Sequence, residues 1–225
     1  MMISHAMEDY LKTIYKLQRG QEVVSTSAIA EQLRVSPASA TNMIKRLAEL
    51  KLLEHNPYRG VALTPAGEKI ALEVLRHHRL LELYLREALG YSLDQVHDEA
   101  ERLEHSISEE FEARVDELLG FPTVDPHGDP IPTKDGVLHD PEHVALADVE
   151  AGQEVVVRRV SDRDPHRLRY LVEIGLLPGE RVELTHKAPF DGPLTLLVGE
   201  ERREQVIGRD LARDVYVSPE EEPTP

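Results

Sequence analysis

The sequence predicts a mainly α-helical N-terminal part, made of a winged helix-turn-helix and a helical dimerisation region, followed by a small C-terminal β-barrel. Three observations support this fold class. Apolar residues recur at helical spacing through the first half of the chain. The segment FPTVDPHGDPIPTKDG, at 121–136, is rich in Pro, Gly and Asp and interrupts this pattern. Short β-type segments separated by small turns follow it.

The composition sets the broad class of the protein. The chain has 225 residues, of which 40% are hydrophobic, enough to form a real core. No apolar run approaches the roughly 18–20 residues that a membrane span needs, and MMISHAMEDY carries acidic residues where a signal peptide is basic and then apolar. The absence of Cys excludes disulfides, thiolate catalysis and Cys-ligated metal sites. We therefore expect a soluble cytoplasmic protein with no membrane partner.

The net charge of −16 is divided unevenly along the chain. The first 67 residues hold 8 Lys and Arg against 6 Asp and Glu, a balance of +2, so the remainder carries −18. Affinity for nucleic acid depends mainly on neutralising phosphates. If the chain binds DNA, the N-terminal part must do so while the acidic remainder faces away.

The first 63 residues have the pattern of a winged helix-turn-helix. A helix is expected over 7–19, and a second one over AIAEQL after the cap-type residues 25–27. Ser36 and Pro37 are typical of an N-cap and the first helical position, and they begin a helix that runs to about Leu50. LLEHNPYRGVALT then predicts two short strands around a turn.

The N-terminal end of the 37–50 helix is expected to enter the major groove of DNA. Short polar residues begin this helix, and Asn42 is the best single candidate for reading a base, because Asn pairs with adenine through two hydrogen bonds. Basic residues are placed to contact phosphate. The alternative is a helical hairpin packed inside a larger domain. The DNA-binding candidates are Thr26, Ser27, Ser36, Pro37, Ala38, Ser39, Thr41, Asn42, Lys45, Arg46, Tyr58 and Arg59.

Two long helices are expected next, the first from Thr64 to about Leu89 and the second from about 92 or 93 to Leu119. Their broad apolar faces indicate a dimerisation layer. Further on, EVVVRRV, RVELTH and LTLLVG read as short strands, and HRLRYLVEIGLLPGE contains one short helix. We divide the chain into a DNA-binding domain (1–75), a dimerisation and metal-binding domain with a Pro-rich linker (76–140), a small β domain (146–218) and a disordered tail (219–225).

His and Glu side chains recur on the two long helices. His97, Glu101, Glu104 and His105 share one face of the second helix at 3.6 residues per turn. His78 and Glu82 share a face on the first. Facing each other, they could form metal sites, whereas the alternative is a solvated acidic face. Oxygen and nitrogen ligands without sulfur favour Mn²⁺ or Fe²⁺, although Zn²⁺ and Cu²⁺ would bind more tightly by intrinsic affinity.

The sequence resembles the diphtheria toxin repressor family of metal-dependent regulators, including its manganese transport regulator branch. The resemblance rests on MEDYLKTIY, the winged helix-turn-helix, HHRLLE, VHDEAERLEH and DPHGDPIP, and covers about residues 5–140. The C-terminal barrel is similar to the SH3-like domain of that family. The resemblance implies a homodimer that binds a palindromic operator when loaded with Fe²⁺ or Mn²⁺, with one or two ions per subunit.

The resemblance also implies particular ligands. One family site corresponds to Asp9, Glu101, Glu104 and His105. Asp9 stands where iron-type members have Met, and Glu101 where they have Cys, which favours Mn²⁺ over Fe²⁺. The manganese branch has a second carboxylate where this chain has Lys12, which argues against its type of two-metal cluster. An ancillary site corresponds to His78, Glu82 and His97, with Asp164 and His166 as the nearest candidate ligands from the SH3-like domain.

We therefore expect a metal-dependent regulator, a repressor of metal-homeostasis genes, and not an enzyme. Asp9 lies on the first helix and the other ligands lie on the dimer side, so an ion that joins them would fix the spacing of the two DNA-binding heads. The alternatives are a winged-helix regulator with an organic effector and a two-metal helical enzyme. A further alternative is an SH3-like domain that mainly binds a Pro-rich segment such as 121–132.

Overall fold

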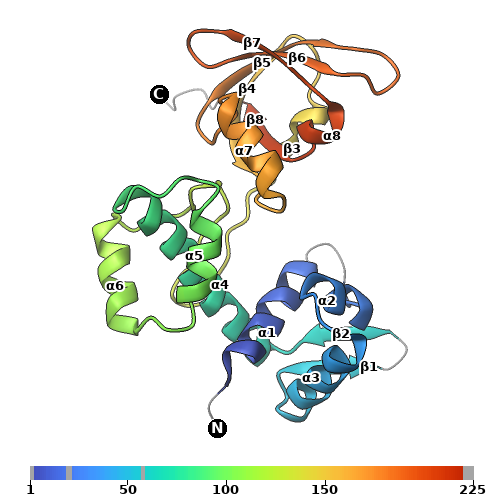
Figure 1. Cartoon of the computed structure of the whole chain (residues 1–225), viewed down its shortest axis with the longest axis vertical. Coiled ribbons are helices and arrows are strands. Elements are labelled where there is room, and N and C mark those ends of the chain that lie inside the picture. The colour runs from blue at the N-terminus through green and yellow to red at the C-terminus, as the bar shows by residue number, and fades with distance from the viewer. Residues whose placement is uncertain (1–2, 19–21, 57–58, 220–225) are drawn as a thin grey trace.

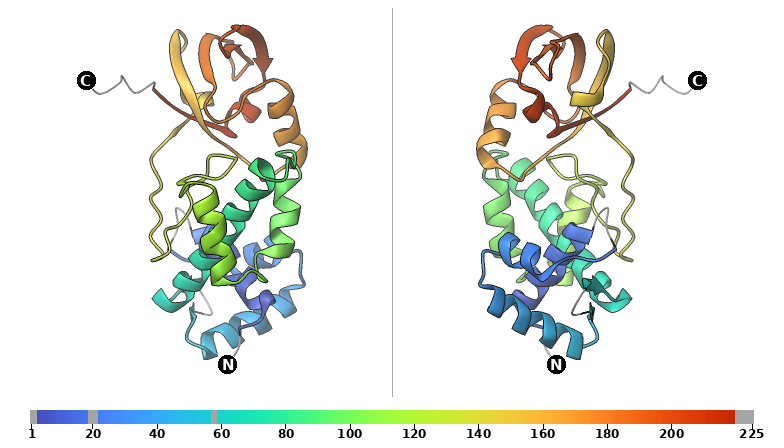
Figure 2. Two further views of the ribbon diagram at one scale, coloured as in Figure 1. Left: turned by 90° about the vertical axis from the view of Figure 1, so that its left-hand side faces the viewer. Right: turned by 90° about the vertical axis from the view of Figure 1, so that its right-hand side faces the viewer.

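The computed structural model describes residues 3–18, 22–56 and 59–219, and three structural parts follow one another along its longest axis (Figure 1). The N-terminal part lies at one end, a helical part lies in the middle and a sheet lies at the other end. The two side views show the connecting segment 133–143 running along one side of the molecule (Figure 2). The final residues 220–225, most of the predicted tail, lie outside the described residues.

The N-terminal part is a winged helix-turn-helix, as predicted. Its elements are α1 (His5–Gln18), α2 (Thr26–Gln32), α3 (Pro37–Glu49), β1 (Leu53–Asn56) and β2 (Gly60–Leu63). Ser36 begins α3 by accepting a hydrogen bond from the N–H of Ser39, and Pro37 takes the first helical position, as the sequence indicates. The two strands pair antiparallel and form the wing. Leu11, Ile14, Ile29, Ile44 and Leu47 are fully buried in the core of this part.

Helix α4 (Pro65–Glu87) joins the N-terminal part to the middle of the molecule. Thr64 caps its first turn, and Ala71 on it belongs to the N-terminal core. Its second half packs against α5 (Val96–Leu103) and α6 (Glu109–Leu118). α4 passes without a break through position 75, where we divide the first two domains. One continuous helix therefore connects the N-terminal part to the helical part.

The prediction of a single helix from about 92 to 119 is wrong, because α5 and α6 are separate helices. Glu104 is the C-cap of α5, and Ser108 begins α6 by accepting a hydrogen bond from the N–H of Phe111. Ser side chains favour helix ends over helix interiors because they bond to nearby backbone groups. The sequence HSISEE carries two Ser residues at this break, so the chain turns directly after His105.

The C-terminal part is a six-stranded antiparallel sheet with the strand order β3-β8-β4-β5-β6-β7. The sequence predicted β4, β5, β6 and α7, but missed the two-residue strand β3, the charged strand β7 and the C-terminal strand β8. Buried Val, Leu and Ile side chains fill the core of the sheet. The elements are β3 (Val144–Ala145), the 3-10 turn Leu146–Asp148, β4 (Gln153–Val160), α7 (Pro165–Glu173), β5 (Arg181–Lys187), β6 (Leu194–Val198), β7 (Arg203–Ile207), α8 (Arg209–Ala212) and β8 (Val215–Pro219).

Across the described ranges, none of the helices combines the length and the apolar character that a membrane crossing requires.

Candidate metal centre and DNA-binding surface

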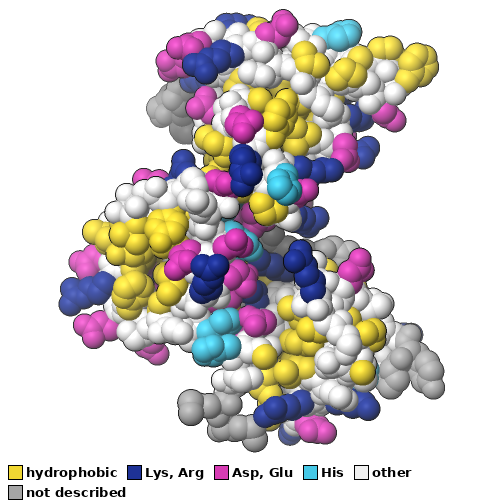
Figure 3. Space-filling view, in the orientation of Figure 1, with side chains coloured by type: hydrophobic (Ala, Val, Ile, Leu, Met, Phe, Trp, Pro, Cys, Tyr) yellow, Lys and Arg dark blue, Asp and Glu magenta, His cyan; other side chains and the backbone are white. Residues whose placement is uncertain are grey.

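Three groups of His, Asp and Glu side chains meet in the middle of the molecule, where charged and His side chains gather on the surface (Figure 3). In each group, the oxygen and nitrogen atoms that could bind an ion lie within 4.8 Å of one another. Group A is Asp9, Glu104 and His105, group B is His78, His97 and Glu101, and group C is Glu82, His127 and Asp162.

Group A joins α1 to the end of α5. The Nε2 atom of His105 lies 2.7 Å from Oδ1 of Asp9 and 3.3 Å from Oε1 of Glu104. Its other ring nitrogen, Nδ1, lies 2.6 Å from Oε2 of Glu8. A carboxylate on the second nitrogen is the usual partner of a His that binds a metal, because it fixes the tautomer and the orientation of the ring. Group A thus has three converging ligand atoms and a residue that orients one of them.

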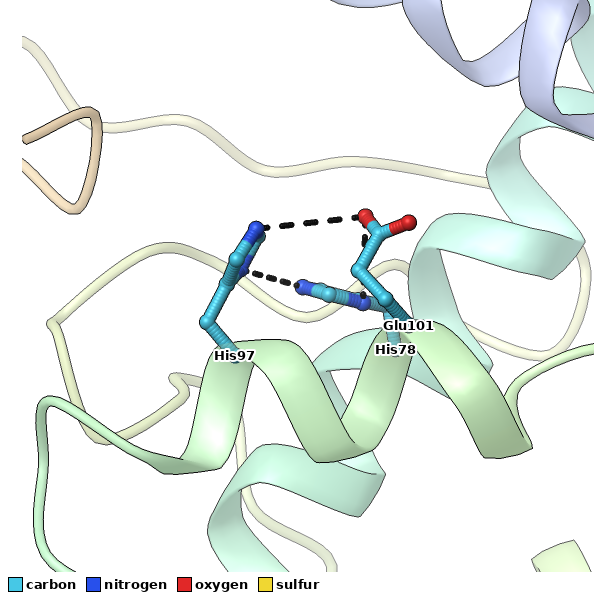
Figure 4. A group of neighbouring side chains, drawn as sticks. All are labelled: His78, His97 and Glu101. Carbon is cyan, nitrogen blue, oxygen red and sulfur yellow. Dashed lines mark hydrogen bonds and ion pairs between the residues drawn. The ribbon is translucent and has the colours of Figure 1, made fainter. Parts of the chain in front are cut away.

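Group B lies between α4 and α5 (Figure 4). His97 and Glu101 are one turn apart on α5, and both point toward His78 on α4. The distance between Nε2 of His78 and Nδ1 of His97 is 3.2 Å, and Oε1 of Glu101 lies 3.9–4.0 Å from a nitrogen of each ring. Two imidazoles and one carboxylate are a donor set for a divalent ion.

Lys12 lies between groups A and B. Its ammonium is buried, with Nζ 2.6 Å from Oε1 of Glu101 and 2.5 Å from Oε1 of Glu104. Burial lowers the pKa of Lys12, but the two carboxylates outweigh it and raise the pKa above its ordinary value. Burial alone would raise the pKa of Glu101, but the contact with the Lys12 ammonium outweighs burial and lowers this pKa to about 2. The Lys12 ammonium is therefore a cation that Glu101 and Glu104 share, at a position between their carboxylates.

Group C brings together α4, the Pro-rich segment and the sheet. Glu82 and His127 are almost completely buried, while Asp162 follows β4 and comes from the C-terminal part. Nδ1 of His127 is 3.7 Å from Oε2 of Glu82, too far for a hydrogen bond, and this nitrogen has no hydrogen-bond partner among the described residues. A buried ring nitrogen without a partner is rare in a folded protein. The separation of these two atoms suits an ion held between the imidazole of His127 and the carboxylate of Glu82.

Glu82 connects group C to group B. Its Oε1 lies 3.0 Å from Nε2 of His78 and 3.1 Å from Nδ1 of His97. Burial lowers the pKa of His78, but Glu82 and Glu104 outweigh it and raise the pKa to about 8. Burial likewise opposes the charged form of His127, yet Glu82 raises its pKa to about 9. The three groups therefore form one continuous set of coupled charges from α1 to the sheet.

Seven of the predicted ligand candidates lie outside the SH3-like domain, and the structure brings all seven together. It groups them differently from the two sites that the sequence predicted. Glu101 was expected with Asp9 and lies in group B. Glu82 was expected with His78 and His97, which it does contact, and it also reaches into group C. Two residues of group C, His127 and Asp162, were missed.

Asp164 and His166 belong to none of the three groups. Asp164 is the N-cap of α7, where its carboxylate accepts a hydrogen bond from the N–H of His166. The residue that approaches the centre is Asp162, two positions earlier in the chain. His127 could have been suspected because it lies within DPHGDPIP, whereas nothing local in the sequence distinguishes Asp162 from its neighbours.

The surface predicted to bind DNA is open at the N-terminal end of α3. Ser36, Pro37, Ala38, Ser39 and Asn42 are exposed there. Ser27, Lys45, Arg46 and Arg59 are also exposed, while Thr26 and Thr41 are half-buried. Tyr58 lies outside the described residues. Ser36 and Ser39 bond to each other and Thr41 donates to the carbonyl of Pro37, so these hydroxyls are partly engaged. Asn42 remains the exposed candidate whose side-chain amide offers both a hydrogen-bond donor and an acceptor.

Three family models match successive parts of the chain. Residues 2–61 match the family described as "Iron dependent repressor, N-terminal DNA binding domain". Residues 64–133 match "Iron dependent repressor, metal binding and dimerisation domain", and residues 144–219 match the FeoA domain. The matches follow the order of the three structural parts.

Whole proteins show the same similarity. The "Diphtheria toxin repressor" of Corynebacterium efficiens is 32% identical over 190 residues, which cover 80% of this chain and 83% of that protein. The "HTH-type transcriptional regulator MntR" of Bacillus pumilus is 37% identical over 120 residues, which cover 53% of this chain and 83% of that protein. A solved structure, "Manganese-dependent transcriptional repressor complex with manganese", is 40% identical, with a TM-score of 0.86, over 95% of this chain and 99% of that one.

Proposed function

This chain belongs to the diphtheria toxin repressor family of metal-dependent DNA-binding repressors, and from that premise we propose that it is a Mn²⁺-responsive repressor. The observation that carries the choice of metal is the donor set. Groups A, B and C contain only imidazole nitrogens and carboxylate oxygens, and the chain has no Cys. Such ligands suit Mn²⁺ and, as the second choice, Fe²⁺. Zn²⁺ binds more tightly in general, so coordination geometry must provide the selectivity.

We propose two ions per chain. One would be held by group A, and the other by group C with help from His78 or His97. This assignment is supported by the three converging atoms of group A and by the unpartnered nitrogen of His127. Lys12 already places a positive charge between Glu101 and Glu104, which argues against a further ion at that point. A divalent ion in group A would be held by Asp9, Glu104 and His105 and would cross-link the two like-charged carboxylates.

The cross-link in group A acts on the position of the DNA-binding head. Asp9 and Glu8 lie on α1, whereas Glu104 and His105 lie at the end of α5. An ion bound to both sides would hold α1 against the helical part. In a homodimer this would fix the distance between the two α3 helices, so that both could enter operator half-sites about one helical turn, roughly 34 Å, apart.

The dimer contact is proposed to lie on the outer face of α6 and the residues next to it. Phe111, Leu118 and Phe121 are 40%, 66% and 68% exposed there, and hydrophobic side chains gather over α6 (Figure 3). Exposed apolar groups that lie together commonly mark an interface. A palindromic operator would match the two-fold symmetry of such a dimer.

Operator binding with and without metal tests the proposed function. We would select the operator from random DNA and measure its binding in EDTA and in titrated Mn²⁺, Fe²⁺ and Zn²⁺. We expect binding to appear with Mn²⁺ at lower concentration than with Fe²⁺. Equal binding in EDTA would overturn the proposal and would point to an organic effector. Metal and DNA should strengthen each other's binding by the same factor, corresponding to about 1–3 kcal/mol.

A further inference from the structure

Asp162 reaches group C only if the sheet is docked correctly on the helical part. The docking contact includes a backbone seam, which we define as His127 and Gly128 on one side and Arg158 to Val160 of β4 on the other. The N–H of Val160 donates a hydrogen bond of 2.9 Å to the carbonyl of His127. His127 therefore offers its side chain to group C while its backbone holds the strand that leads, two residues later, to Asp162.

Gly128 allows the two backbones of this seam to approach closely. A Cβ atom on Gly128 would lie 1.9 Å from the carbonyl oxygen of Arg158 and 2.9 Å from Cα of Arg159. Real Cβ atoms essentially never come within 3.0 Å of another heavy atom, and both atoms are backbone, so no side-chain rotation could relieve the overlap. Any side chain at this position must push the loop and β4 apart.

A β-bulge on β4 presents the opposing carbonyl. The pairing of β4 with β8 shifts between Val157 and Arg159, so Arg158 is an extra residue in the strand. A bulged residue is left out of the regular ladder and locally re-aims the strand. The loop side is also fixed, because the carboxylate of Asp125 accepts hydrogen bonds from the N–H groups of His127 and Asp129. Hydrogen bonds therefore fix the loop on one side of the seam and the bulged strand β4 on the other, so neither backbone can shift easily to make room for a side chain at Gly128.

Two further contacts belong to the same docked arrangement. Leu93, in the turn before α5, is 3% exposed and lies in the hydrophobic cluster of the sheet, together with Leu168 and Leu171 of α7. Arg169 of α7 pairs with Asp94 at 2.9 Å, although both side chains are partly exposed. The seam thus acts together with an apolar anchor at Leu93, whose carbonyl lies 3.4 Å from Nε2 of His127.

We propose that Gly128 is a positioning residue of the metal centre, whose missing side chain lets the C-terminal sheet dock with Asp162 opposite Glu82 and His127. This inference rests on the proposed ion in group C. It makes the position of the whole sheet part of the metal site. The carbonyl and the imidazole of His127 then connect docking and metal binding through one residue.

The test compares Gly128→Ala with Gly152→Ala. Gly152 has nearly the same left-handed backbone, with φ +87° against +88° for Gly128, but a Cβ there would meet nothing within 4 Å. Both variants therefore place Ala at nearly the same positive φ, and only one of them disturbs the seam. We expect Gly128→Ala to weaken one of the bound Mn²⁺ ions about 10–100-fold in calorimetric titrations, as the loss of a supporting contact does at other metal sites. Gly152→Ala should titrate like the parent.

A double-variant comparison separates positioning from general destabilisation. Asp162→Ala should weaken the same ion, and adding Gly128→Ala to it should cause a smaller further loss than Gly128→Ala causes in the parent, because one of the residues that the seam positions is already absent. X-ray scattering of the metal-free Gly128→Ala protein should show a larger radius of gyration than that of Gly152→Ala. If Gly128→Ala does not fold, Leu93→Ala removes the apolar anchor instead, and it must weaken the same ion.

The outcomes distinguish the inference from the proposed function. Unchanged Mn²⁺ binding by Asp162→Ala would mean that group C is not an ion site; the inference and the proposed second ion would then both fall, while the ion of group A and the Mn²⁺ response would still be decided by operator binding in EDTA. Weakened binding by Asp162→Ala together with parent-like binding by Gly128→Ala would overturn the inference alone. Equal losses in Gly128→Ala and Gly152→Ala would also overturn it, because strain rather than docking would then be the cause.

Discussion

The ammonium of Lys12 lies 2.5 Å from the carboxylate of Glu104, and both groups are buried where α1 meets the end of α5. The same ammonium also binds Glu101. This contact joins the DNA-binding part to the helical part without any ion. The metal-free protein thus already has a monovalent link at the place where the family resemblance implies that a divalent ion acts.

Replacing Lys12 with Met should destabilise the metal-free protein. Glu104 would remain buried without its cation, and breaking a buried ion pair costs about 3 kcal/mol when one partner, here Glu101, is partly exposed. Urea unfolding in EDTA measures this change, and saturating Mn²⁺ should recover most of it. Lys69→Met, at an exposed position of α4, is the matched control. Equal stability of both variants would contradict the role of the buried ammonium.

Asp9→Ala should abolish Mn²⁺-dependent operator binding while the dimer stays folded, because Asp9 is the group A residue on α1. Glu101→Ala should weaken this binding less, because Glu101 belongs to group B and holds Lys12 but binds neither proposed ion. Fluorescence anisotropy with a labelled operator measures the loss, and size-exclusion chromatography checks the dimer. Glu99→Ala is the control, because Glu99 lies on the same helix but pairs with Arg102 instead. Parent-like Mn²⁺ dependence in Asp9→Ala would remove group A from the mechanism.

Asn42→Ala should relax the sequence preference for the operator. Asn42 is exposed at the N-terminal end of α3 and can form two hydrogen bonds with adenine, worth about 1–3 kcal/mol of discrimination. Selection from random DNA should return a motif with one degenerate position in each half-site. Lys45→Ala should instead weaken binding to all sequences and reduce the salt dependence. An unchanged motif would mean that another residue reads the base.

The stability of the metal-free protein should fall as the pH rises above about 6.5. Burial opposes the charged form of His78 and of His127. Neighbouring carboxylates outweigh burial and raise the pKa of His78 to about 8 and that of His127 to about 9. Each charged ring therefore stabilises the folded protein. This contribution is complete below the unfolded pKa of about 6.5 and is lost as the pH passes 8 and 9. For His78 alone, this contribution to the free energy of unfolding is on the order of 2 kcal/mol.

Mn²⁺ should reverse this pH trend, because an ion binds the neutral imidazole and displaces its proton. Chemical unfolding between pH 6 and 9.5, with EDTA and with Mn²⁺, measures both curves. His186→Gln, at an exposed position on β5, serves as the control. A metal-free stability that rises over this range would show that the two rings are neutral in the folded protein.

Leu118→Glu and Phe121→Glu should dissociate the dimer. Both side chains are more than 60% exposed in the single chain, and burying a charge there would oppose association. Sedimentation at several protein concentrations gives the oligomeric state. Phe190→Glu introduces the same change at a fully exposed position in the turn between β5 and β6 and should leave the dimer intact. If the first two variants remain dimeric, the contact lies on another face.

The local pattern of the sequence was sufficient for the elements whose signals lie within a few residues. The Ser36 cap, the Pro37 start and the periodic apolar residues of α3 predicted that helix, because helix formation depends on neighbours three and four positions apart. The same spacing brought His97 and Glu101 onto one face, and the lack of Cys limited the metal centre to nitrogen and oxygen ligands. The prediction failed at 104–108, where competing caps ended one helix and began another.

Only the tertiary structure decided which of these side chains share a site. His127 and Asp162 lie 35 residues apart in the chain, in a loop and a strand connection without periodicity, and meet because β4 docks against a loop at Gly128. Lys12 was read as a departure from a family pattern, and the fold showed that its ammonium pairs with two of the expected ligands. Such contacts depend on long-range packing, which fixes distances that no short stretch of sequence encodes.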